Sequence, residues 1–371
     1  MIFLIVTHVL HTESSERFFA YAPYVREMNL WLIYPDKVVI VAPLDRAGAP
    51  GAIDLEYDHP DIEFIPIPEF DIQGTKSILR TVFLLPVLIS RIVRGMKRAD
   101  HIHLRCPGNV GLLGCIVQIF FPGKKKTAKY AGNWDWNSQQ PWSYRLQHRI
   151  LRNIFLTRNM TALVYGDWPD MTKNIRPFFT ASYSEKDKQA VYKRPLSEAI
   201  NLAFVGTLTK NKSPLTCLEV LRALADKGIN ATLTYCGEGP ERIEIRQKIQ
   251  DYQLKDKVKL LGNVNAEKVK EVLQEAHFLA FISRSEGWPK AVSEAMWWGC
   301  LPVTTPVSCV PWMLDNGSRG ELVDDKVTEI TSLIEGYISD ENRFNIKSEN
   351  AMDWSREYTL ERFEKEIQNL I

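Results

Sequence analysis

The sequence feature that most constrains the fold is a repeated alternation of short apolar runs with amphipathic, helix-like segments. In the first half, the runs IFLIV, KVVIVAP, HIHLR and TALVYG are separated by helical patterns, the longest from about Lys76 to Lys97. A polar stretch from Thr180 to Glu198 interrupts the pattern, which restarts at NLAFVG and continues through ATLTYCG, HFLAFIS and LPVTT. Short strands connected through helices form mostly parallel sheets. The sequence therefore predicts two doubly wound α/β domains, and its 371 residues also favour two.

The predicted domain limits follow from this interruption. We expect a Rossmann-like N-terminal domain over 1–185, a Rossmann-like C-terminal domain over 200–352, and a last helical segment over 353–371. The apolar residues of that segment fall on one face of a helix, and the segment can cross back to the N-terminal domain. Ligands of such sheets bind beyond the carboxyl ends of the strands, so functional residues are sought there.

Composition excludes some classes of protein. A net charge of +1 argues against a dedicated nucleic-acid binder. The six cysteines form no CxxC pair and lie in apolar runs, which favours buried, reduced thiols in the cytoplasm. No apolar run reaches the length of a transmembrane helix. The run from Thr81 to Ser90, flanked by Arg80 and Arg91, is either a core helix with a proline kink or a surface helix resting on the inner face of the cell membrane.

One strand-to-helix corner, 286-EGWPKAVSE-294, carries two carboxylates. Glu286 is expected in the loop before a helix and Glu294 in the second turn of that helix. The start of a helix attracts anions through its free N–H groups. A phosphate there, flanked by hydroxyl groups that donate to the two carboxylates, describes a nucleotide-sugar, although two solvated acids remain the alternative. Between the acids lie Gly287, Trp288, Pro289 and Lys290.

Two further corners lie at the same expected sheet edge. In 235-YCGEGPER-242, the glycines Gly237 and Gly239 flank Glu238 and let the backbone approach a ligand at the start of a helix. In 204-FVGTLTKNKSP-214, the strand ends at Gly206, and Lys212 precedes the next helix, where a lysine can bind a diphosphate. Alone, the first is as well explained by an ordinary turn and the second by a solvated lysine.

In this order and spacing, the three corners resemble the donor-binding half of the retaining GT-B glycosyltransferases of family 4, glycosyl transferases group 1. The matching segments are VGTLTKNK, CGEGPE and EGWPKAVSEAMWWGCLPV, which together span about Asn201 to Val303. The N-terminal half resembles the family only in its alternation. The resemblance implies the GT-B fold, with two Rossmann-like domains facing across a cleft.

The resemblance also implies roles for individual residues. Glu286 and Lys212 would be catalytic, Glu286 by holding hydroxyls of the transferred sugar and Lys212 by stabilising the leaving diphosphate. Glu294 would bond the ribose of the donor. The other implied donor-binding residues are Gly206, Thr207, Gly237, Glu238, Gly239, Arg284, Gly287, Trp288, Pro289 and Lys290. Because the family usually has arginine where Thr207 stands, we hypothesise that Arg284 or Lys290 supplies the missing cation.

Candidate acceptor-binding residues lie at strand ends in the first half. The loop 7–16 lacks the paired glycines usual in the family, and 132-GNWDWN-137 lacks the histidine that many members carry. A histidine near a strand end is more often structural than catalytic. The candidates are His8, His11, Arg105, Asn133, Trp134 and Asp135.

The implied reaction is the retaining transfer of a sugar from a nucleotide-sugar donor, UDP- or GDP-linked, to a hydroxyl of a saccharide or lipid-linked acceptor. A role in bacterial surface polysaccharide or glycolipid synthesis is expected, with a peripheral membrane contact through the N-terminal domain as the sharper alternative. No cofactor or metal is needed in this scheme, because Lys212 and helix N–H groups act on the diphosphate. Alternatives are a nucleotide-sugar epimerase or phosphorylase on the same fold, or a non-catalytic nucleotide-sugar-binding protein. A dehydrogenase is disfavoured because no strand leads into GxGxxG.

Overall fold

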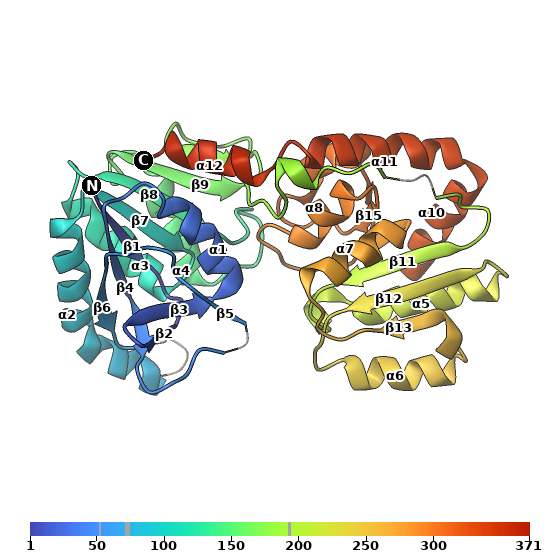
Figure 1. The fold of residues 1–371 in the computed structure, drawn as a ribbon, viewed down its shortest axis with the longest axis horizontal. Helices are drawn as coiled ribbons and strands as arrows, with labels where there is room; N and C mark the ends of the chain where they lie inside the picture. The colour runs from blue at the N-terminus through green and yellow to red at the C-terminus, as the bar shows by residue number, and fades with distance from the viewer. Residues whose placement is uncertain (52, 71–74, 192–193) are drawn as a thin grey trace. The chain divides into compact units, whose positions relative to one another are not determined.

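The computed structural model describes residues 1–51, 53–70, 75–191 and 194–371, which form two compact units (Figure 1). The first comprises Met1–Thr180 together with Phe363–Ile371, and the second comprises Ala181–Arg362. Each unit contains a largely parallel sheet with helices, which confirms the predicted fold class. The division falls at Thr180, before the predicted limit of 185. The chain re-enters the first unit at Phe363, inside the segment that was expected to cross back.

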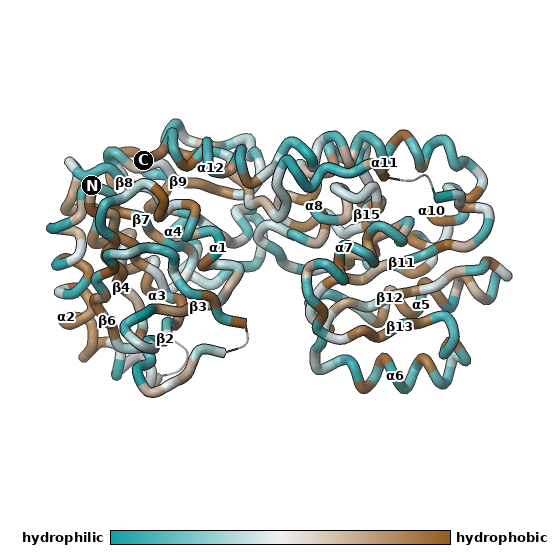
Figure 2. Tube along the Cα trace, viewed as in Figure 1, coloured by the Kyte–Doolittle hydropathy of each residue, from teal (hydrophilic) through white to brown (hydrophobic). Residues whose placement is uncertain are grey.

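The first unit is built on a ten-stranded sheet in the order β10-β9-β8-β7-β1-β4-β2-β3-β5, with β6 also paired to β4. From β10 to β4, and from β4 to β6, neighbouring strands are parallel. The central strands are apolar and buried, as the brown segments inside this unit show (Figure 2). The strands are β1 (Ile2–Val6), β2 (His11–Ser14), β3 (Arg17–Tyr21), β4 (Lys37–Asp45), β5 (Asp54–Glu56), β6 (Ile62–Ile67), β7 (His101–Cys106), β8 (Lys125–Tyr130), β9 (Met160–Tyr165) and β10 (Ile175–Phe178).

Helices cover this sheet. In the long helix α2, Leu88, Ile92 and Met96 are buried at helical spacing. Gly95 lets α2 lie close to the sheet, because a Cβ at this position would be 3.0 Å from Leu4 and 3.1 Å from Val41. The helices are α1 (Ala22–Trp31), α2 (Thr75–Arg98), α3 (Asn109–Val117), α4 (Trp142–Arg152) and α12 (Leu360–Gln368), with a 3-10 turn η1 (Gln118–Phe120).

The segment from 11 to 21 differs from the predicted loop 7–16. It is a hairpin of β2 and β3, and α1 begins only at Ala22. Ser15 and Glu16 at its tip have φ values of 51° and 63°. Two left-handed residues match the twist of a tight hairpin, and neither glycine nor asparagine marks this turn in the sequence.

The second unit contains a six-stranded parallel sheet in the order β13-β12-β11-β14-β15-β16. Its strands are β11 (Ile200–Val205), β12 (Ala231–Cys236), β13 (Val258–Leu260), β14 (Phe278–Phe281), β15 (Leu301–Thr304) and β16 (Glu321–Leu322). The strand order reverses between β11 and β14. Such a switch point is where open α/β sheets bind ligands.

Helices and 3-10 turns connect these strands. The helices are α5 (Pro214–Asp226), α6 (Arg242–Asp251), α7 (Ala266–Glu275), α8 (Lys290–Trp297), α9 (Val310–Met313), α10 (Val327–Ser339) and α11 (Glu341–Ser355). The 3-10 turns are η2 (Glu185–Asp187), η3 (Lys210–Lys212), η4 (Lys255–Lys257) and η5 (Asp315–Gly317). Proline is favoured at the first position of a helix, where its missing N–H costs no hydrogen bond. Pro214 occupies this position in α5, whereas α6 begins after Pro240 and Pro289 is the N-cap of α8.

The last helix completes the first unit. Phe363 of α12 packs against Phe178 and Phe179, with ring centroids 5.3 and 5.6 Å away. The buried ammonium of Lys129 lies 5.2 Å from the Phe363 ring centroid and donates to the Phe179 carbonyl. Glu366 forms an ion pair with Arg176. The C-terminal segment is therefore part of the core of this unit.

Candidate active site

The strand-order reversal in the second unit brings Lys212 and Glu286 together. Lys212 ends η3 after β11, and Glu286 lies in the loop after β14. The Lys212 Nζ donates to the Glu286 Oε1 across 2.5 Å, with the side chains 20% and 12% exposed. The ammonium also lies 4.8 Å from the Phe281 ring centroid. Both groups predicted to be catalytic therefore lie at one point of the sheet edge.

Neighbouring groups hold the Glu286 loop in place. The buried Ser283 donates through its hydroxyl to the Glu286 Oε1 over 2.6 Å. The carbonyl of Asn211 accepts from the backbone N–H of Arg284 over 2.9 Å, and the Asn211 amide donates to the Ser285 carbonyl over 3.1 Å. Asn211 and Ser283 were not among the predicted site residues, although each lies in a strand-end loop that also supplies one.

Glu294 occupies a separate, partly buried place on α8. Its Oε1 accepts a hydrogen bond of 2.6 Å from the hydroxyl of Ser182. Burial raises the pKa of the Glu294 carboxyl above its ordinary value, and the bond from Ser182 and the charge of Lys290 oppose this shift. Sequence analysis missed Ser182 because it lies in the polar stretch that marked the domain boundary. Nothing in that stretch points to a partner for Glu294.

The glycines of the other two corners allow two loops to pack closely. Gly206 and Gly237 both have φ of 149°, and a Cβ on Gly237 would lie 1.9 Å from the carbonyl oxygen of Gly206. A Cβ on Gly239 would lie 2.4 Å from the Leu208 carbonyl oxygen. The backbones of the loops after β11 and β12 therefore pack directly against each other. A side chain at Gly237 or at Gly239 would push the two loops apart. Glu238 forms an ion pair with Arg242.

The remaining predicted donor-binding residues differ in how much of their surface is exposed to solvent. Thr207 and Arg284 are exposed, and Lys290 is half-buried at the first turn of α8. Trp288 is only 8% exposed, and its ring packs against Trp312 and Tyr358, so the implied donor contact of this residue would be through its backbone N–H. Pro289 is also buried, and Gly287 accepts from the Ser308 hydroxyl through its carbonyl.

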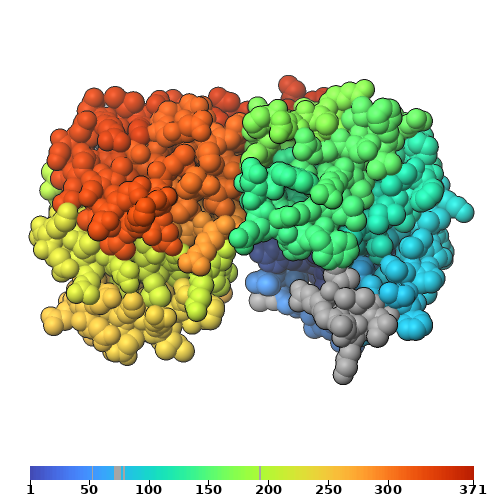
Figure 3. Space-filling view, turned by 180° about the vertical axis from the view of Figure 1, so that it is seen from behind, coloured from blue at the N-terminus to red at the C-terminus, as the bar shows by residue number. Residues whose placement is uncertain are grey.

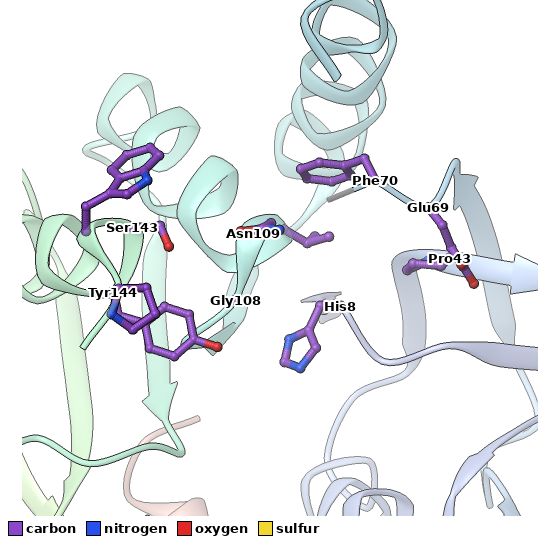
Figure 4. A pocket seen from close by; sticks show the side chains of 11 residues that line it. His8, Pro43, Glu69, Phe70, Gly108, Asn109, Ser143 and Tyr144 are labelled. Atoms are coloured by element: carbon purple, nitrogen blue, oxygen red, sulfur yellow. The ribbon is translucent and has the colours of Figure 1, made fainter. Parts of the chain in front are cut away.

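In the first unit, a cavity of about 630 Å³ lies at the carboxyl ends of β1, β4, β6 and β7 (Figure 4). His8 follows β1 and packs closely on Gly108, where a Cβ would lie 2.7 Å from the His8 Nδ1. Partial desolvation and the nearby Arg105 lower the pKa of the His8 imidazole, which favours its neutral form. The cavity is lined by His8, Pro43, Glu69, Phe70, Gly108, Asn109, Val110, Pro141, Trp142, Ser143 and Tyr144.

Two predicted acceptor-binding residues are corrected to core residues. His11 has no exposed surface, and its Nε2 lies 2.8 Å from the Tyr57 hydroxyl. Burial lowers the His11 pKa to about 4. Trp134 is 4% exposed and packs on Tyr130 and His148. The side chains of His11 and Trp134 are buried inside the unit because aromatic neighbours enclose them.

The other three acceptor candidates have partners within the protein. The Arg105 guanidinium donates to the Glu27 carboxylate over 2.9 Å and is 15% exposed. Asn133 accepts through its side chain from the backbone N–H of Asp135, which in turn accepts from the N–H of Asn137. These bonds shape the turn after β8. None of these three residues lines the cavity. Among the predicted acceptor-binding residues, only His8 lines it.

Within the described ranges, His, Cys, Asp and Glu form no group of three or more that could hold a metal ion. The metal-independent scheme remains a prediction.

The fold and the site define the class of protein. Over 99% of this chain and 98% of the other, the structure is similar to that of Anabaena HepE in complex with UDP and glucose, with a TM-score of 0.66 and 14% identity. At that identity the likeness concerns the fold, which is the two-domain GT-B fold. Residues 186–354 match the model of the family of glycosyl transferases group 1.

Relatives with sequence similarity match part of the chain. The GPI3 subunit of phosphatidylinositol N-acetylglucosaminyltransferase from Saccharomyces cerevisiae is 26% identical over 174 residues, which cover 47% of this chain and 37% of that protein. WcaL of Salmonella typhimurium, named for colanic acid biosynthesis, is 30% identical over 132 residues, or 34% of this chain and 32% of that one. The matched region thus spans about a third of the length of these relatives.

Proposed function

We propose that the protein is a retaining glycosyltransferase that moves a sugar from a nucleotide-sugar donor to an acceptor hydroxyl. The observation that carries the proposal is the Lys212–Glu286 pair at the strand-order reversal of a glycosyl transferases group 1 domain. A cation and an acid at this edge suit the two ends of a sugar diphosphate, since one end is anionic and the other is rich in hydroxyl groups.

Each residue then has a defined task. The Lys212 ammonium neutralises the charge that develops on the diphosphate as the bond to the sugar breaks, and N–H groups at the start of α8 add to it. Glu286, positioned by Ser283, accepts from hydroxyls of the sugar. Glu294 accepts from the ribose hydroxyls. In this scheme neither a metal ion nor another cofactor takes part.

The donor is proposed to be UDP-linked, with a GDP-linked sugar as the alternative. HepE was solved with UDP, and the yeast relative is named as an N-acetylglucosaminyltransferase. The name of WcaL supports a role in bacterial surface polysaccharide or glycolipid synthesis. All six cysteines are buried and free, which supports a reducing compartment such as the cytoplasm.

Three other functions make different predictions. A nucleotide-sugar epimerase would isomerise the donor without an acceptor, and a phosphorylase would need inorganic phosphate. A non-catalytic nucleotide-sugar-binding protein, which the threonine at 207 favours, would bind the donor but neither hydrolyse nor transfer it.

The test is a thermal-shift screen of nucleotide-sugars, followed by donor hydrolysis and transfer assays on the best ligand. We expect wild type to release nucleotide and Lys212→Met to lose most of that activity. Lys210→Met is the matched control, because Lys210 is an exposed lysine of the same 3-10 turn. Equal activity of Lys212→Met and wild type would refute the proposal.

A further inference from the structure

One side of α2 is exposed and apolar. Exposed fractions are 53% for Val82, 81% for Phe83, 42% for Val87 and 40% for Ile89. Figure 3 shows α2, in light blue, on the surface of the first unit. Among the described residues, 13 of the 15 exposed large hydrophobic side chains belong to this unit. This asymmetry points to a partner specific to the first unit.

The same helix is basic. Its 24 residues include no Asp or Glu, and it ends with Lys97 and Arg98. Arg80, Arg94 and Lys97 are exposed and form no ion pair with any residue that the structure describes. At helical spacing, Phe83, Val87, Arg94 and Lys97 follow one another along the outer side. A row of apolar side chains that is followed along the helix by basic side chains complements an anionic lipid surface.

The topology places the apolar end of α2 near the cavity. Because β6 and β7 are parallel, α2 between them runs back from the carboxyl edge of the sheet to its amino edge. Val82 and Phe83 therefore lie toward the cavity edge and Lys97 toward the opposite edge. Glu69 and Phe70, just before α2, line the cavity, as does the exposed Trp142. A bilayer that received this end would lie beside the cavity mouth.

We propose that α2 docks the first unit on an anionic bilayer and that the cavity receives a hydroxyl-bearing acceptor carried by a lipid. The second part rests on the proposed function, whereas the docking does not. None of the helices in the described ranges is both long and apolar enough to cross a membrane. Docking of this kind buries side chains only to the depth of the head-group boundary, and cations remain at the phosphates.

The test is co-sedimentation of the full chain with phosphatidylcholine vesicles, with and without phosphatidylglycerol. We expect binding to the anionic vesicles that weakens at about 0.5 M salt, and at least about tenfold weaker binding of Phe83→Asp. The matched control is Ile243→Asp, at an 82% exposed position in the second unit, which should bind like wild type. Arg94→Gln with Lys97→Gln should lower binding and its salt dependence.

Three results would overturn the docking: no binding to anionic vesicles, equal loss in both aspartate variants, or a Phe83-dependent dimer in the absence of vesicles. Donor hydrolysis in solution separates this inference from the proposed function. It is measured on the docking variants and on Lys212→Met. Hydrolysis that depends on Lys212 without vesicle binding would leave the function standing and remove the docking. Vesicle binding without donor hydrolysis would support the docking and remove the proposed function.

Discussion

The Nζ of Lys212 and the Oε1 of Glu286 lie 2.5 Å apart, so the two groups assigned to opposite ends of the donor satisfy each other's charge. A diphosphate that draws on Lys212 must compete with this carboxylate. Sugar hydroxyls that donate to Glu286 would compensate for the lost contact. Productive binding therefore requires the complete donor. A nucleotide without the sugar would compensate for less of the lost Lys212–Glu286 contact.

Glu286→Gln is expected to reduce transfer about a hundredfold or more, because the acid that we propose contacts the sugar loses its charge. The affinity for the nucleoside diphosphate alone should change little or increase, since Lys212 is no longer neutralised. Calorimetric titration with the nucleotide, beside a transfer assay, checks both. A large loss of nucleotide affinity with normal turnover would contradict the assigned roles.

Glu294→Gln is expected to weaken donor binding by roughly 10- to 100-fold, because hydrogen bonds to a carboxylate contribute about 1.5–3 kcal/mol. The raised pKa of Glu294 also predicts a pH dependence. As the pH falls through this pKa, the carboxyl becomes neutral, so donor affinity falls at a higher pH than for an ordinary glutamate. Affinities measured as the pH is lowered should fall in wild type above the ordinary glutamate range and should lack this fall in the variant.

Arg284→Ala and Lys290→Ala separate the two candidates for the cation missing at Thr207. Arg284 is exposed beside the Glu286 loop, whereas Lys290 is half-buried and interacts with Glu294. The residue that contacts the diphosphate should lose about tenfold or more in donor affinity when truncated, as expected for a charged hydrogen bond. An Arg284→Ala variant with unchanged affinity and turnover would remove Arg284 from contention.

Gly237→Ala is expected to destabilise the second unit by several kcal/mol or prevent its folding, because the new Cβ would lie 1.9 Å from the Gly206 carbonyl oxygen. Gly336→Ala is the control. It lies in α10, and a Cβ added there would have nothing within 4 Å, so this variant should be neutral or stabilising. Urea unfolding of both variants checks the difference. Equal stability of the two would contradict the close packing of the two loops.

Acid should destabilise the first unit. Burial, and secondarily Arg152, lowers the pKa of His148 to about 4. Because the unfolded chain takes up the proton at an ordinary pKa near 6.5, stability is lost as the pH falls below that value, by about 2 kcal/mol between pH 7 and 5. His148→Phe keeps a buried ring and should remove this share of the loss. Urea unfolding at both pH values measures it.

Sequence analysis identified the parts of the fold that repeat a simple pattern. The strands and the flanking helices of both sheets follow from apolar runs and helical spacing, and Lys212 and Glu286 follow from their places after two strands. The hairpin tip at Ser15 and Glu16 was missed because these residues take left-handed conformations without a sequence signal. Helix α11 was missed because its sequence is mostly polar and its apolar positions show little periodicity.

The site residues that sequence analysis missed or misassigned depend on tertiary contacts. Ser182 meets Glu294 across 112 positions of the chain, a pairing that no local pattern encodes. His11 and Trp134 follow strands as a ligand-binding residue would. Only the packing of Tyr57 and His148 around them reveals their burial.

The return of Phe363–Ile371 to the first unit constrains the order in which the protein can be made. A ribosome that has released residues 1–180 has not yet supplied the ring that packs on Phe178 and Phe179 or the acid that pairs with Arg176. The entire second unit must emerge before these contacts can form. Of the two units, the one translated first is therefore the one completed second, and a fragment cut at Thr180 would leave this aromatic surface uncovered.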